Sequence, residues 1–256
     1  MVEKVWGCTR LPAPFAAPEG QRIGEIWFEP PPELDALLVK YLFTSEKLSV
    51  QVHPSDALAP AGHRGKEECW LVLDAEPGAQ LAIGFREEVT PDQMRTGALD
   101  GSIEQMLEWH DVAAGDFFYI PAGTVHAIGP GLALVEVQQN SDVTYRFFDY
   151  GRPRELHLDE SLTVAHGAPY DRSGQRRVAP GESVVLVDGP KFRLDRVVGS
   201  PAASLADRHT GAVLALPLDG EILLSGERIA PGECALALSL DQLAFADGGT
   251  CLIASC

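Results

Sequence analysis

The chain has 256 residues, of which 45% are hydrophobic and 22% are charged, and its formal net charge is −17. This length allows one large or two small domains, each able to bury its own core. The negative charge disfavours a nucleic-acid partner and an anionic membrane surface, because both require a broad basic face. It still permits an anionic small molecule, since a few basic side chains can converge in one pocket.

The cysteine content predicts a cytoplasmic protein. The number is odd and no C-x-x-C pair occurs, so we expect reduced thiols and neither a disulfide framework nor a zinc–thiolate site. The N-terminal residues contain no apolar signal-peptide core, and no apolar run approaches the roughly 20 residues that span a bilayer. The five cysteines are Cys8, Cys69, Cys234, Cys251 and Cys256.

The first part of the chain is predicted to form short strands separated by turns. Residues 31–38 are expected to form a short helical turn, and residues 90–109 have helical spacing, with Pro91 suited to a first turn. Strands are expected at residues 23–28, 38–43, 48–53, 69–73, 79–85, 112–119, 127–138 and 143–150.

A polar, Gly- and Pro-containing stretch at residues 152–175 is interpreted as a linker to a second set of short strands. The sequence APGEC at 230–234 echoes AAGDF at 113–117, which suggests two related β-barrels in tandem. We predict a mainly β chain of two jelly-roll barrels with a few short helices, divided into residues 1–160 and 161–256. His209, the only late histidine, is interpreted as a surface-loop residue.

The strongest motif is GDFFYIPAGTVH at residues 115–126, which matches the second cupin motif, G-x5-P-x-G-x2-H, at every fixed position. Gly115 allows the turn into a strand, and Pro121 with Gly123 makes a sharp corner. His126 then begins the next strand and is expected to point into the barrel, where an imidazole is suited to bind a metal.

Two further segments offer ligands on the same barrel. Ser49, Gln51 and His53 alternate along a strand and therefore share one face. Glu68 shares a face with Lys66 at the start of the next strand. The two nitrogens and two oxygens of the set suit Zn²⁺, with Mn²⁺, Fe²⁺ or Co²⁺ as alternatives. The expected ligands are Gln51, His53, Glu68 and His126.

Arg146 lies in a predicted strand among aromatic residues, where a half-buried guanidinium needs an anionic partner. Two interpretations remain open: an internal ion pair with Asp142 or Asp149, or binding of an anion near the metal. Glu136 and Gln138 share one face of the preceding strand.

Four segments together resemble the short type I phosphomannose isomerases of bacteria: KLSVQVHPSD, GKEECWLVL, IPAGTVHAIGPG and EVQQNSDVTYRFFDYGRPRELH. KVWG, LPAPF and IGEIWF near the N-terminus are similar to that family too. The resemblance covers about residues 1–165, and the remainder agrees only in general with a second, degenerate cupin barrel. It implies a tandem cupin that interconverts mannose 6-phosphate and fructose 6-phosphate and binds one Zn²⁺ per chain.

The resemblance also implies roles for individual residues. Gln51, His53, Glu68 and His126 match the zinc ligands, and Arg146 matches an active-site arginine. Ser49, Lys40 and Lys66 match residues that line the pocket and meet the phosphate, and Glu136 matches a carboxylate proposed in proton transfer.

The residues themselves suggest a mechanism. Moving a carbonyl between C1 and C2 requires an enediolate, which Arg146 would stabilise while Glu136, or alternatively Lys66, carries the proton. Arg152 and Arg154 are either further phosphate ligands or solvated loop residues.

Two other classes of function remain open. An Fe²⁺-dependent cupin oxygenase is compatible with His53, Glu68 and His126 alone. A non-catalytic sugar-binding cupin would have the same fold but is expected to lose ligands or the base, whereas here all the matched positions are filled.

Overall fold

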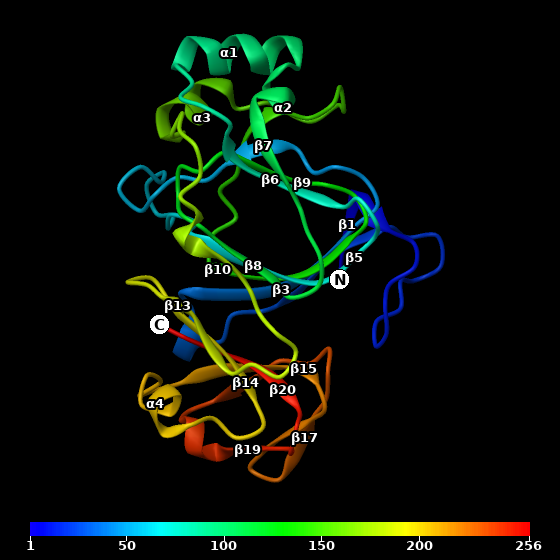
Figure 1. Ribbon diagram of the computed structural model, residues 1–256, viewed down its shortest axis with the longest axis vertical. Coiled ribbons are helices and arrows are strands. Elements are labelled where there is room, and N and C mark those ends of the chain that lie inside the picture. Colours follow the sequence, from blue (N-terminus) through cyan, green and yellow to red (C-terminus); the bar gives the residue numbers. More distant parts are fainter.

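The structure is a computed structural model that describes residues 1–256, and it contains two β-barrels stacked along the long axis of the molecule (Figure 1). The first barrel consists of a seven-stranded sheet, in the order β1-β2-β3-β10-β5-β8-β12, and a five-stranded sheet, in the order β11-β4-β9-β6-β7. The second consists of sheets ordered β13-β14-β20-β15-β18 and β17-β16-β19. The predicted fold class, mainly β with tandem cupin barrels, is confirmed.

All strand pairs are antiparallel, and most strands are short. The strands of the first barrel are β1 (Val2–Cys8), β2 (Ile23–Phe28), β3 (Leu37–Thr44), β4 (Val50–Val52), β5 (Glu68–Ala75), β6 (Gln80–Phe85), β7 (Leu107–Asp111), β8 (Asp116–Ile120), β9 (His126–Ile128), β10 (Leu132–Gln139), β11 (Tyr145–Phe148) and β12 (Gln175–Arg177). Those of the second are β13 (Val184–Asp188), β14 (Arg193–Val198), β15 (Val213–Asp219), β16 (Ile222–Leu224), β17 (Glu227–Ile229), β18 (Ala235–Ala237), β19 (Leu243–Phe245) and β20 (Thr250–Ser255).

The helices are few and short. They are η1 (Pro32–Leu34), α1 (Pro91–Asp100), α2 (Ile103–Met106), α3 (Leu158–Val164), η2 (Arg172–Gly174), α4 (Ala203–Ala206) and η3 (Leu240–Gln242). Helices α1, α2 and α3 lie together at the end of the first barrel that is remote from the second (Figure 1). No helix is long and apolar enough to cross a bilayer, and all five cysteines are free thiols.

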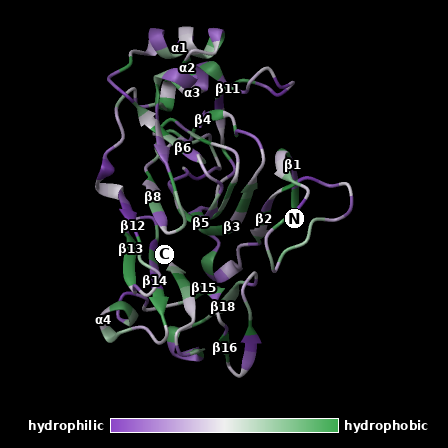
Figure 2. Ribbon diagram, turned by 45° about the vertical axis from the view of Figure 1, so that its right-hand side comes forward, coloured by the Kyte–Doolittle hydropathy of each residue, from purple (hydrophilic) through white to green (hydrophobic).

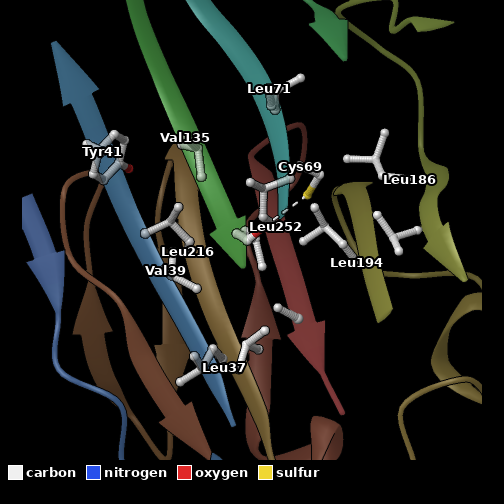
Figure 3. Packing of buried hydrophobic residues seen from close by; sticks show 14 of the residues in the cluster. Leu37, Val39, Tyr41, Cys69, Leu71, Val135, Leu186, Leu194, Leu216 and Leu252 are labelled. Atoms are coloured by element: carbon white, nitrogen blue, oxygen red, sulfur yellow. Dashed lines mark hydrogen bonds between the residues drawn. The ribbon is translucent and has the colours of Figure 1, made fainter. Parts of the chain in front are cut away.

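The second barrel packs against the outer face of the seven-stranded sheet (Figure 3). Successive side chains of a strand point to opposite faces, so β3 directs Val39 and Tyr41 to this interface and Lys40 into the first barrel. Strands β14, β15 and β20 supply the facing hydrophobic side chains, which include Leu194, Leu216 and Leu252. Green segments of β13 and β14 mark this apolar contact in Figure 2. The second barrel therefore supports the back of the sheet whose front lines the interior of the first.

The predicted helix over residues 90–109 is wrong at its C-terminal end. Thr90 and Gln93 form a capping box that starts α1, and Gly101, with φ of 83°, ends it in the left-handed conformation. After the single turn of α2, residues Leu107–Asp111 form β7, which pairs with β6. Tertiary pairing therefore overrides the helical spacing of this stretch.

Other boundaries also differ from the expectation. Strand β1 was not predicted, and the expected strand over 127–138 is interrupted at Gly131, whose φ is 78°. The expected linker over 152–175 contains α3, and the proposed boundary at residue 160 falls inside that helix. Strand β12 pairs with β8, so the chain leaves the first barrel only after Arg177.

The interpretation of His209 as a surface residue is wrong. The ring is buried, with Nδ1 at 2.8 Å from the Ser255 hydroxyl oxygen and Nε2 at 3.0 Å from an Asp195 carboxylate oxygen. Both partners come from strands that are distant in sequence, so no local sequence pattern indicates that His209 is buried. The trio ties the loop after α4 to β14 and β20 and satisfies three buried polar groups.

Candidate active site

Two rows of residues, one on each sheet of the first barrel, position the candidate site. On the five-stranded sheet, Gln51 of β4 lies opposite both His126 of β9 and Arg146 of β11. On the seven-stranded sheet, Glu136 of β10 lies opposite Lys40 of β3 and Trp70 of β5. Residues that are paired across strands share a face of the sheet, so the register brings these side chains together.

His53, Glu68 and His126 form a buried cluster whose ligand atoms all lie within 4.8 Å of one another. The Nε2 atom of His53 lies 3.5 Å from one oxygen of Glu68, and Nε2 of His126 lies 3.4 Å from the other. The Glu68 side chain is only 1% exposed, and its Oε1 accepts no hydrogen bond. A buried carboxylate oxygen without a hydrogen-bond donor requires a cationic partner.

Both imidazoles are oriented to present a lone pair at Nε2. His53 Nδ1 lies 2.9 Å from the carbonyl oxygen of Val143, and His126 Nδ1 lies 3.0 Å from that of Thr124. A carbonyl only accepts hydrogen bonds, so each Nδ1 carries the proton and each Nε2 is free to bind a metal. Burial lowers the pKa of both histidines, His53 the more strongly, and this favours the neutral ligand form.

Gln51 completes the cluster from the pocket side. Its Nε2 lies 3.2 Å from Nε2 of His126, and its Oε1 accepts a hydrogen bond of 3.1 Å from Ser49. A half turn of the amide exchanges its oxygen and nitrogen, so Gln51 can present an oxygen beside the two histidines. The unsatisfied Glu68 oxygen and the two Nε2 lone pairs fit a divalent metal ion, and the donor set suits Zn²⁺.

A pocket of about 250 Å³ lies beside this cluster, and His53, Glu68 and His126 themselves are not among its lining residues. Gln51 and Lys66 line the pocket and also contact the buried cluster. Gln51 contacts His126. Lys66 contacts His53 and Glu68. Six residues that the sequence assigned to metal, substrate or catalysis lie in its wall: Lys40, Ser49, Gln51, Lys66, Glu136 and Arg146. The structure thus brings together Ser49, Lys40, Lys66, Glu136 and Arg146, whereas Arg152, one of the alternative phosphate ligands, lies outside the pocket wall.

The lysines of the pocket are each paired with carboxylates. Lys40 Nζ lies 2.8 Å from Glu136 Oε1, and Lys66 Nζ lies 3.5 Å from the same oxygen and 2.6 Å from Glu68. Glu136 Oε2 accepts a hydrogen bond of 3.0 Å from the Trp70 indole. Burial opposes the charge of Lys40, but the neighbouring carboxylates outweigh it and raise its pKa. These ion pairs keep the buried charges compensated and fix the side chains.

Arg146 is different, because no carboxylate oxygen lies within 4.0 Å of its guanidinium. Burial and the charge of nearby Arg154 lower its pKa more than Asp149 and Glu155 raise it, although a guanidinium remains protonated. The internal pair with Asp142 or Asp149 is therefore not formed. Arg146 is a pocket cation available to an anionic ligand.

Asp149 is occupied by two other arginines. Arg154 donates hydrogen bonds of 2.6 Å to both of its oxygens, and Arg152 approaches one of them at 3.2 Å and Glu46 at 3.0 Å. Neither arginine is a freely solvated loop residue as one interpretation expected. Arg154 reaches the pocket wall, whereas Arg152 does not line it.

The N-terminal strands supply pocket residues that the sequence analysis did not assign. Lys4, Glu25 and Trp27 line the pocket from β1 and β2. Glu25 bridges Lys4 at 2.8 Å and Lys40 at 3.5 Å, which continues the alternation of charges outward from the metal cluster. The signal was present in IGEIWF, where residues 25 and 27 alternate onto one strand face, but only the pairing with β3 shows that this face is the pocket.

The fold and the site define a two-barrel cupin with a candidate divalent-metal centre beside a charged pocket. Its relatives are mannose-6-phosphate isomerases, so the resemblance predicted from the sequence is confirmed. The chain is 41% identical to the mannose-6-phosphate isomerase of Streptococcus mutans serotype c over 166 residues, 61% of this chain and 52% of that protein. The matched region thus spans about half the length of this curated relative. No family model matches the chain.

Solved structures agree over a larger part of the fold. The mannose 6-phosphate isomerase of Bacillus subtilis superposes with a TM-score of 0.80 at 23% identity, covering 100% of this chain and 97% of the other. A zinc-bound mannose 6-phosphate isomerase superposes with a TM-score of 0.69 at 15% identity, over 98% of this chain and 96% of the other. At these identities the likeness establishes the two-barrel fold.

Proposed function

We propose that the chain is a metal-dependent aldose–ketose isomerase that interconverts mannose 6-phosphate and fructose 6-phosphate. The observation that carries the proposal is the unpaired guanidinium of Arg146 in the pocket beside a buried histidine–glutamate–histidine cluster. A binder of neutral sugars has no need of an uncompensated cation. The names of the relatives supply the substrate, mannose 6-phosphate.

The first barrel, which was predicted as residues 1–160 and extends to Arg177 in the structure, is proposed as the catalytic unit and the second as its support. We further propose that Gln51, His53, Glu68 and His126 hold one Zn²⁺ per chain. The bound ion would polarise the substrate carbonyl and its neighbouring hydroxyl. Arg146 would stabilise the negative charge that develops on these oxygens in the enediolate. Lys40 and Ser49, which line the pocket, would bind and orient the phosphorylated end of the sugar.

A coupled assay tests the proposal directly. Protein loaded with Zn²⁺ is expected to convert mannose 6-phosphate to fructose 6-phosphate, a chelator to abolish turnover, and added Zn²⁺ to restore it. Metal analysis of the reactivated protein is expected to give one zinc ion per chain. Fully metal-loaded protein that shows no turnover of mannose 6-phosphate would contradict this proposal. Oxygen consumption by the iron-loaded protein would instead favour the cupin oxygenase.

Proton transfer between C1 and C2 is proposed for Glu136, with Lys66 as the alternative. Lys66 is the pocket residue that links Glu136 to the metal cluster, at 3.5 Å from the first and 2.6 Å from Glu68. Glu136→Gln keeps the shape and the hydrogen bond from Trp70 but removes the base, so we expect kcat to fall by about 10²–10⁴-fold. Metal content is expected to stay near the wild-type value, because Glu136 is not one of the proposed ligands. If Glu136→Gln retained most of its turnover, the role would pass to Lys66.

A further inference from the structure

Trp27 is a large aromatic side chain left partly open in the pocket wall. The residue is 40% exposed, whereas Trp6 and Trp70 are buried. It lines the same pocket as Arg146 and Gln51. An exposed indole inside a polar pocket is a surface that a ligand with an apolar face can cover.

The register of the seven-stranded sheet fixes the place of this ring. Trp27 lies opposite Lys40, Lys40 opposite Glu136, and Glu136 opposite Trp70, so the four side chains form one row on the inner face of the sheet. Strand β2 lies three strand spacings from β5, which carries Glu68. At about 4.8 Å per spacing, Trp27 stands roughly 14 Å across the sheet from the strand of the metal ligand. The ring therefore lies at the end of the pocket remote from the metal cluster.

The orientation of the indole is held by two direct contacts, one of which is itself anchored. Its Nε1 donates a hydrogen bond of 3.1 Å to Glu25 Oε2, and the Lys40 ammonium lies 5.5 Å from the ring centroid. Glu25 is itself anchored by Lys4 at 2.8 Å. A ring that is fixed before a ligand arrives loses little conformational entropy on binding.

Charge is balanced at this end of the pocket. Lys4 and Lys40 are compensated by Glu25 and Glu136, so the cation that remains without a carboxylate is Arg146, on the opposing sheet. Apart from these paired charges, the pocket wall around Trp27 exposes the aromatic surface of the indole. Such a surface suits the C–H groups of a sugar carbon chain.

We infer that Trp27 is a specificity residue that contacts the distal carbons of the sugar phosphate and selects six-carbon over four-carbon substrates. This inference rests on the proposed function, which places the reacting C1 and C2 at the metal cluster. A six-carbon chain that starts there extends along the row, so that its phosphate reaches Lys40 and its distal carbons lie against the neighbouring indole of Trp27, whose ring centroid is 5.5 Å from Lys40 Nζ. A four-carbon chain ends short of the indole.

The test measures binding without turnover. Two non-isomerisable sugar acids that differ by two carbons, 6-phosphogluconate and 4-phosphoerythronate, are titrated calorimetrically into metal-loaded wild type, Trp27→Ala and Trp27→Phe. Trp27→Ala is expected to bind the six-carbon acid about ten-fold more weakly, the scale of one aromatic contact, and the four-carbon acid less than two-fold more weakly. Trp27→Phe is expected to retain most of the selectivity.

Trp109→Ala is the matched control. Trp109 also donates its indole N–H in a hydrogen bond, to the Glu104 carbonyl at 2.9 Å, and also has a lysine ammonium over its ring, Lys47 at 5.4 Å from the centroid. It does not line this pocket, so its loss is expected to leave the ratio of the two affinities unchanged.

The two hypotheses fail separately. Equal weakening of both acids in Trp27→Ala, or no change in either, would overturn the inference even where the wild type isomerises mannose 6-phosphate. A wild type that binds the six-carbon acid selectively through Trp27 but shows no isomerase turnover would overturn the proposed function and leave the specificity role standing. Metal content is measured for every variant and is expected to be unchanged.

Discussion

Replacing His126 by alanine is expected to abolish metal binding and isomerase turnover together. The imidazole is fully buried, its Nδ1 is held by the Thr124 carbonyl, and its Nε2 faces Glu68 and Gln51. Substitutions of residues that merely support a ligand cost about 10–100-fold in metal affinity. Loss of a ligand is expected to exceed that range, and the measurement is metal content after dialysis against a weak chelator, with turnover measured in parallel.

His63→Ala provides the control for this experiment, because His63 is an exposed loop histidine outside the cluster. It is expected to retain full metal content and activity. Near-ultraviolet circular dichroism checks that His126→Ala is folded, and Glu68→Gln, which keeps the side-chain shape but removes the charge, serves as a second ligand variant. Full metal content in both ligand variants would exclude the cluster as the metal site.

Local sequence patterns predicted those site residues whose positions depend only on neighbouring residues in the chain. Alternation along one strand places Ser49 and Gln51 on a common face, and the turn at Pro121 and Gly123 delivers His126 to the start of β9. The partners of these residues depend on register between distant strands, which no local pattern contains. Glu136 lies opposite Lys40 and Trp70 only because β10 pairs with both β3 and β5.

The features of the fold that the sequence did not predict also depend on pairing between distant strands. Strand β7 lies in a stretch with helical spacing because pairing with β6 decides its conformation. His209 lacks any local sign of burial, since Asp195 and Ser255 reach it from β14 and β20. Arg146 illustrates the limit for function: its sequence context left open an ion pair or a ligand, and only the pairing of Asp149 with Arg152 and Arg154 separates the two.

Arg146→Gln is therefore expected to separate activity from stability. In the proposed mechanism, losing the guanidinium removes the donor that meets the developing oxyanion, and one such donor is worth about 10²–10³-fold in kcat. Metal content is expected to be unchanged, because Arg146 is not a ligand. Arg146→Lys keeps the charge but loses the forked hydrogen-bonding geometry, so only partial activity is expected from it.

Thermal unfolding supplies the second readout. No carboxylate oxygen lies within 4.0 Å of Arg146, and burial and Arg154 oppose its charge more strongly than Asp149 and Glu155 support it. Arg146→Gln is therefore expected to unfold at the same temperature as the wild type or slightly higher. Replacing a residue that serves function at the expense of stability commonly leaves the unfolding temperature unchanged or raises it. Arg95→Gln, which breaks an exposed ion pair with Asp159 on the outer helices, should leave kcat unchanged. An Arg146→Gln protein that lost stability while keeping its kcat would identify Arg146 as a structural residue and remove the main support for an anionic substrate in this pocket.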